Sequence, residues 1–277
     1  MIRYRLRMLF LTGVLGGISL SVLYINPYGG EISLSEALLQ LSGSRGDFPM
    51  GFAMTEMVSF SLRLLPAYLF ELFFGIMLYR HFCTASIYIF SRYPKRVRWY
   101  FRECLALGGG ALLFQVLLVG AALVTAALRY RLYIDAGGLL LGLYALAIPA
   151  LWTYGATLAV NLVAVKAGSS TGFGVVAGFQ TVCIVLFGLE DTLRRYADMV
   201  IEPEGKLLRF NPMASLVMGW HTSGIEVLDR AVHAPYRTMD FNHSLALCLA
   251  LCLGILLAGA WIIQRHELLK ADSETGV

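Results

Sequence analysis

Three polar side chains inside long apolar runs are the residues of this sequence that could do chemistry within a membrane. Arg63 and Glu71 share one apolar run, and Asn161 lies in another. Charged groups in the hydrocarbon layer are costly, so they usually face a partner helix or a wet cavity. Arg63 and Glu71 are two helical turns apart, which is too far for a simple pair within one helix. A role in a transport pathway, a contact with another subunit and snorkelling of Arg63 all stay open.

Three histidines offer a second candidate, a metal site. His221, His233 and His243 fall in one polar segment that also holds several acids. Their spacings of 12 and 10 residues match no metal-binding motif. Solvated or interfacial histidines are therefore the preferred interpretation, and we expect no metal site.

Motifs for familiar enzyme chemistry are missing from the sequence. It contains no GxxxxGK[ST], no HExxH and no GxSxG, so it predicts neither a P-loop nucleotide site nor zinc-protease or serine-hydrolase chemistry. The five cysteines show no CxxC or zinc spacing, and we interpret them as small buried apolar residues. We expect no catalytic residue and no cofactor in this chain.

The composition is that of a membrane protein. Hydrophobic residues make up 58% of the chain and charged residues 14%, whereas soluble domains carry roughly 25% charged residues. Apolar runs of about 20 residues recur, which is the length of a membrane-spanning helix. We therefore predict an all-α polytopic membrane protein, organised as one transmembrane domain over residues 1–277. The net charge of +4 does not indicate nucleic-acid binding, because the basic residues lie at the membrane borders.

Six membrane spans are predicted from the apolar runs. They cover about residues 8–25, 57–79, 104–128, 139–165, 172–189 and 245–263. The first span contains a GxxxG pattern at Gly13 and Gly17, and the fifth contains one at Gly174 and Gly178. Such patterns allow another helix to approach closely.

The segment between the second and third spans, residues 80–103, is strongly basic. It holds six of the chain's 22 Lys and Arg and one acid, Glu103. A basic segment between spans is the usual mark of a cytosolic loop. Residues 85–90 are apolar and helix-compatible, and Pro94 then interrupts any helix. The pattern indicates either a short helix at the inner membrane surface that docks on a soluble partner, or a loop that fixes topology and touches lipid head groups.

Two other segments connect spans on the opposite side. In residues 26–56, Ser33 and Glu36 form a capping box, and the leucines that follow predict a short helix on the surface. In the long outer segment 190–243, Asn211-Pro212 marks a break, residues 214–220 are apolar but too short to span, and residues 225–232 predict another short helix. We expect residues 214–220 to dip into the outer leaflet or to pack on the spans.

Charge counts orient the chain. With both termini cytosolic, the inner segments carry 12 of the Lys and Arg residues and the outer segments carry nine. Six of those nine lie in the long outer segment, where charge matters least for topology. Arg129 and Arg131 are the residues that argue against this orientation.

The whole layout resembles the membrane-spanning permease subunits of type-2 ABC exporters. The similarity covers the six spans, the basic stretch after the second span and the polar outer segment before the sixth. Among these permeases the chain is most similar to the small ones found beside bacterial peptide-antibiotic export and immunity systems, on its length and on the stretch from Asn211-Pro212 to Trp220-His221.

The resemblance implies a function and a set of partners. It implies a coupling helix at about residues 83–94, followed by the basic run 95–102, that docks on a separate ATPase. The implied coupling residues are Ala85, Ser86, Ile87, Tyr88, Ile89, Phe90, Arg92, Pro94, Lys95, Arg96 and Arg98. It also implies two ATPase copies carrying ATP and Mg²⁺, a second permease chain of the same or a related kind, and a place in the bacterial plasma membrane.

Two other functions are compatible with the sequence. A non-transporting membrane scaffold or immunity protein would explain the lack of motifs equally well. An intramembrane enzyme would need paired polar residues at matched depth, and Arg63, Glu71 and Asn161 do not form an obvious set. A neighbouring gene with nucleotide-binding motifs would favour the permease.

Overall fold

The computed structural model describes residues 2–27, 29–43, 54–81, 96–197, 209–232 and 239–265. Within these residues, six helices are long and apolar enough to cross a membrane. The predicted all-α polytopic fold is therefore confirmed. The helices are α1 (Ile2–Tyr24), α3 (Met54–Phe74), α5 (Arg96–Arg129), α6 (Ala136–Ala167), α7 (Ser169–Ala197) and α10 (Phe241–Arg265).

Each apolar stretch overlaps a predicted span, and most of the helices extend beyond it. The second stretch continues past α3 to His81. Helix α5 begins at Arg96 instead of Cys104, and α7 ends at Ala197 instead of Leu189. Arginine and glutamate are good helix formers, and arginine and aromatic side chains can carry a helix out of the hydrocarbon layer by keeping their polar ends in the interface.

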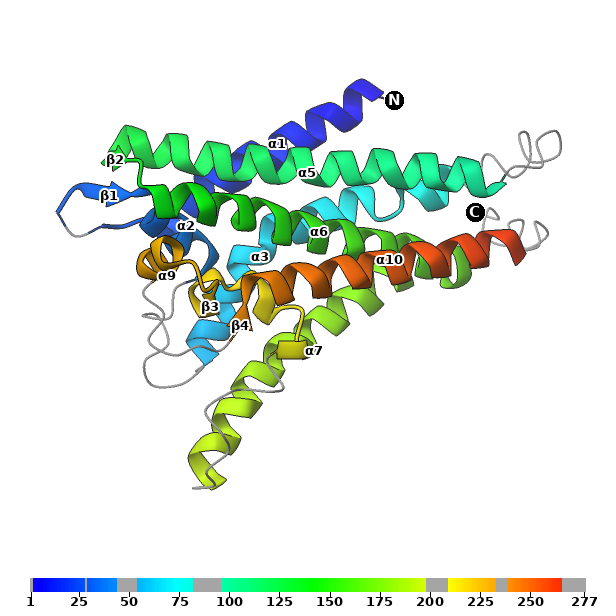
Figure 1. Ribbon diagram of the computed structural model, residues 1–277. Coiled ribbons are helices and arrows are strands. Elements are labelled where there is room, and N and C mark those ends of the chain that lie inside the picture. The colour runs from blue at the N-terminus through cyan, green and yellow to red at the C-terminus, as the bar shows by residue number, and fades with distance from the viewer. Residues whose placement is uncertain are drawn as a thin grey trace.

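The two ends of the bundle differ in character. Figure 1 shows that α1 and α5 begin, and α6 and α10 end, at the same end of the bundle. We call this the basic end, because Arg7, Arg80, Arg96 and Lys166 lie there. The opposite end carries α2 (Leu34–Ser42), the strands and α9 (Glu226–Val232).

At the opposite end, α2 packs on α6 and two short strands pair beside it. The Ser33 side chain caps α2 by accepting a hydrogen bond from the Glu36 N–H at 3.1 Å, so the predicted helix start is confirmed. Strands β1 (Glu31–Ser33) and β2 (Arg131–Tyr133) run parallel. Asp135 then caps α6 and also accepts from the Ser35 N–H at 3.0 Å, which ties α2 to α6.

Helix α1 crosses α5 at its glycines. A Cβ atom on Gly17 would lie 2.2 Å from the Leu118 carbonyl oxygen, and one on Gly13 would lie 3.0 Å from the Leu117 Cβ. Only a residue without a side chain allows so close an approach, and the interpretation of this GxxxG pattern is confirmed. The pattern in the fifth span behaves differently, because Gly174 and Gly178 face open space.

Residues 211–221, which we call the plug segment, are buried throughout. They form two short 3-10 turns, η2 (Ala214–Leu216) and η3 (Met218–Trp220), and lead into β3 (His221–Thr222), which pairs with β4 (Met239–Asp240). The Asn211 side chain donates to the Cys183 carbonyl of α7 at 2.8 Å. The turn η2 packs on α6 and α10, which confirms that residues 214–220 pack on the spans.

Candidate functional site

The intramembrane acid Glu71 faces α7. Its side chain is 1% exposed, and its two carboxyl oxygens lie 2.9 and 3.1 Å from Nε2 of Gln180. Gln180 is also 1% exposed, and its Oε1 atom has no hydrogen-bond partner among the residues that the structure describes. This pair is a polar contact between α3 and α7 at the depth of the hydrocarbon layer.

Arg63 lies on the same helix but is directed to the opposite end of the bundle. Its guanidinium donates to the Gln40 carbonyl near the end of α2 and lies 3.9 Å from the centre of the Tyr24 ring. The last carbonyls of a helix have no partner within that helix, so a cation there both satisfies an acceptor and complements the helix dipole. Arg63 thus joins α3 to α1 and α2.

Asn161 holds an interruption in the second span. Helix α3 ends at Phe74, residues 75 and 76 form a turn, and residues 77–81 are helical again. The Asn161 Oδ1 accepts from the Leu78 N–H at 2.8 Å and the Tyr79 N–H at 3.1 Å, and Nδ2 donates to the Phe74 carbonyl at 3.2 Å. In a continuous helix the Leu78 N–H would bond directly to the Phe74 carbonyl. Asn161 bridges these two groups from α6.

The short helical stretch 77–81 also contacts α5 at the basic end. Nδ1 of His81 lies 3.0 Å from a carboxyl oxygen of Glu103, whose side chain is 13% exposed. His81 and Glu103 flank the segment that the resemblance identifies as the coupling helix. We call residues 77–81 and the start of α5 the two stems of that segment. The first stem is joined to α6 through Asn161, and the two stems are joined to each other through His81 and Glu103.

Most of the expected coupling residues lie outside the described part of the chain. Only Arg96 and Arg98, at the start of α5, are described. The others are Ala85, Ser86, Ile87, Tyr88, Ile89, Phe90, Arg92, Pro94 and Lys95.

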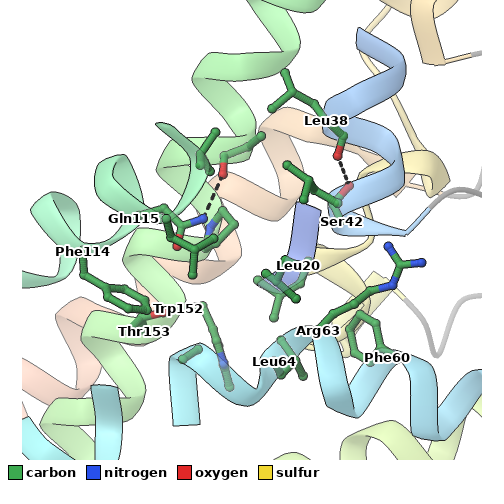
Figure 2. Close-up of a pocket in the computed structure, with 17 residues that line it drawn as sticks. Leu20, Leu38, Ser42, Phe60, Arg63, Leu64, Phe114, Gln115, Trp152 and Thr153 are labelled. Atoms are coloured by element: carbon green, nitrogen blue, oxygen red, sulfur yellow. Dashed lines mark hydrogen bonds between the residues drawn. The ribbon is translucent and has the colours of Figure 1, made fainter. Parts of the chain in front are cut away.

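A cavity of about 90 Å³ lies in the part of the bundle toward the plug segment (Figure 2). Its walls come from α1, α2, α3, α5 and α6, and Leu216 of the plug segment contributes to them. They are mostly apolar. The polar side chains among them are those of Ser42, Arg63, Gln115 and Thr153. Figure 2 shows Gln115 at the wall, with its Nε2 3.5 Å from the Ala145 carbonyl, and the Arg63 guanidinium directed away from Gln115.

Of the three histidines, the structure describes His221 and His243. Among the described residues, no group of three His, Cys, Asp or Glu side chains could hold a metal ion, and His233 lies outside them. His221 is fully buried in the plug segment, with Nδ1 2.9 Å from the Val217 carbonyl and Nε2 2.8 Å from the Ser244 hydroxyl. Because a carbonyl only accepts, Nδ1 donates and Nε2 accepts from Ser244. Burial lowers the pKa of His221 to about 4, although its hydrogen bonds oppose the shift.

The three intramembrane polar residues are therefore not assembled into one site. Arg63, Glu71 and Asn161 have separate partners on α2, α7 and the interrupted second span. Sequence reasoning missed two amides. Gln180 is the partner of Glu71, and Gln115 lines the cavity. A signal was available, since a lone amide within an apolar run is also costly to bury without a partner.

Comparisons with known proteins found no matching family model, no matching curated protein and no matching solved structure.

Proposed function

We propose that this chain is the permease subunit of an ATP-driven exporter of the type-2 ABC kind, and that residues 80–103 couple it to a separate ATPase subunit. The observation that carries the proposal is the anchoring of both stems of that segment. A cytosolic handle transmits motion only if its ends are fixed to the helices that must move. Here Asn161 fixes the stem at Leu78 and Tyr79 to α6, and Glu103 meets His81 across the two stems.

The absence of an enzyme motif supports the same proposal. A subunit that moves cargo by rocking its helices needs no catalytic residue, because ATP and Mg²⁺ are bound by the partner. The close crossing of α1 and α5 at Gly13 and Gly17 is a contact that can shift as a unit. In this proposal the basic end faces the cytosol of a bacterial cell.

The cavity gives a reason for a second permease chain. A volume of about 90 Å³ is that of a small ring or a branched side chain, well below the several hundred Å³ of ordinary ligand pockets. Cargo of any larger size would need a pathway outside this cavity. Two permease chains, identical or related, would enclose such a pathway between them.

The test is co-purification of the tagged full-length chain with the products of its genomic neighbours, followed by an ATP hydrolysis assay. We expect an ATPase in stoichiometric amount. Combined charge reversal of Lys95, Arg96 and Arg98 to Glu should remove it or abolish coupled hydrolysis. The control is Arg131→Glu at the opposite end of the bundle, where the Arg131 side chain is 88% exposed, and it should leave both intact.

Two outcomes would contradict the proposal. A clean preparation with no nucleotide-binding partner would favour the scaffold or immunity function instead. Survival of both assembly and coupled hydrolysis after charge reversal would remove the coupling role from the basic run.

A further inference from the structure

Glu71 and Gln180 form a buried polar contact in which one acceptor, Oε1 of Gln180, has no hydrogen-bond donor among the described residues. Both side chains are 99% buried, and among the described residues the Glu71 carboxyl accepts hydrogen bonds from the Gln180 amide alone. No ion pair to Glu71 is found among the residues that the structure describes. An ionised carboxylate at this depth would be very costly, and a buried acid with no cation beside it usually takes up a proton instead.

The second side chain of the contact needs a donor. Oε1 of Gln180 is buried and without a hydrogen-bond partner in the described residues, and leaving a buried acceptor without a donor destabilises the folded state. A carboxylic acid O–H supplies such a donor. A proton added to one Glu71 oxygen would be donated to Oε1, while the other oxygen keeps accepting from Nε2. In the structure both carboxyl oxygens face Nε2, so forming both bonds requires the Gln180 amide to reorient, and its terminal torsion is soft.

We propose that Glu71 and Gln180 are a proton-binding site that locks α7 to α3. The bound species is H⁺: the carboxylate gains one proton, an O–H···O hydrogen bond forms to Gln180, and no covalent bond between heavy atoms changes. The site is independent of the permease proposal, since it needs no ATPase.

Among the residues that the structure describes, no charged side chain is found in contact with Glu71. Tyr68 on α3 interacts electrostatically with Glu71 and with Cys183 on α7, and this phenol and this thiol are neutral at pH 7 in water. Helix α6 presents the amide of Asn161 to the next turn of α3. None of these groups can compensate a negative charge on Glu71.

The lock would act on more than one helix contact. One turn after Gln180, the Cys183 carbonyl of α7 accepts from Asn211 of the plug segment. Helix α7 begins packed on α6, and Figure 1 shows it diverging from the bundle toward its C-terminal end. Loss of the proton would place a carboxylate in the α3–α7 interface, and we expect the interface to loosen and admit water.

Infrared difference spectroscopy of the full-length protein in lipid nanodiscs tests the site directly. At pH 7 the wild type should show the carbonyl stretch of a protonated carboxylic acid, and this band should be lost in Glu71→Gln. The matched control is Glu226→Gln, which alters an exposed acid at the opposite end of the bundle and should leave the band unchanged. In Gln180→Leu the band should shift, because the acid loses its hydrogen-bond partner.

Each alternative outcome overturns part of the proposal. If no band at pH 7 depends on Glu71, then Glu71 is ionised and the site does not exist. If the band is present but Gln180→Leu leaves its frequency unchanged, then Gln180 is not the partner. Raising the pH until the band disappears should lower the melting temperature of the wild type but not of Glu71→Gln. Parallel pH profiles for the two proteins would show that the proton does not lock the helices.

Discussion

Replacing Asn161 with alanine should destabilise the second span at its interruption. The Asn161 side chain is fully buried and is hydrogen bonded to the Leu78 and Tyr79 N–H groups and to the Phe74 and Thr157 carbonyls. Alanine would remove the Asn161 acceptor from the Leu78 N–H, which is buried, and from the Tyr79 N–H, which is partly buried. At about 1–3 kcal/mol for each orphaned group, the expected loss of unfolding free energy is about 2–6 kcal/mol.

Thr157→Val is the matched control for this change. Thr157 is also fully buried on α6, one turn before Asn161, and its hydroxyl donates only to the Thr153 carbonyl within the same helix. That carbonyl is also placed for its regular helical partner, so we expect a loss of about 1 kcal/mol or less.

The assay is reversible denaturation of the protein in mixed micelles, combined with hydrogen exchange of the amides in residues 77–81. If local opening follows the lost free energy, a loss of about 3 kcal/mol should speed exchange at Leu78 and Tyr79 on the order of 100-fold. Equal stabilities for Asn161→Ala and Thr157→Val, with unchanged exchange at these amides, would refute the assigned bridge.

Three further changes test other contacts. Gly17→Leu should prevent the close α1–α5 crossing and lower the melting temperature strongly, whereas Gly254→Leu, where a Cβ meets nothing within 4 Å, should have little effect. Acidification should remove the stability that neutral His221 contributes. This contribution is fully present above about pH 6.5 and is lost as the pH falls toward the folded-state pKa of about 4. His221→Gln should therefore flatten the profile of melting temperature against pH in this range. Arg63→Met, which keeps the apolar stem, should increase hydrogen exchange in α2 without altering α7.

The parts of the fold that could be predicted depend on local patterns. Apolar run length predicts a span whatever its neighbours are, and a serine three residues before a glutamate predicts a helix start, as Ser33 shows. The close crossing at Gly13 and Gly17 could also be predicted, because the glycines leave a strip of α1 without side chains and another helix can approach closely along that strip. The identical spacing at Gly174 and Gly178 faces open space, so the pattern permits a close contact without specifying a partner.

The partners of the polar residues could not be predicted, because they are set by contacts distant in sequence. Arg63 and Glu71 are separated by two turns of α3, yet one is directed to the end of α2 and the other to the middle of α7. No proline at or next to residues 75 and 76 predicts the interruption there. It depends on Gly75, where a Cβ would lie 2.6 Å from Cγ1 of Val160, and on Asn161 more than 80 residues away. The segment 82–95 lies outside the described residues, so its predicted helix stays a prediction.

The second span connects the two ends of the bundle through a different neighbour at each depth. Arg63 contacts α1 and α2 near the plug segment, Glu71 contacts α7, the interruption is bridged by α6, and His81 meets α5 at the basic end. A displacement of residues 77–81 must therefore either break the bridge at Asn161 or carry α6 with it. Because the two hydrogen bonds that Leu78 and Tyr79 donate to Asn161 oppose the first course, the second is the less costly one for small motions. A force applied at the basic end would then reach α6, which also forms part of the cavity wall.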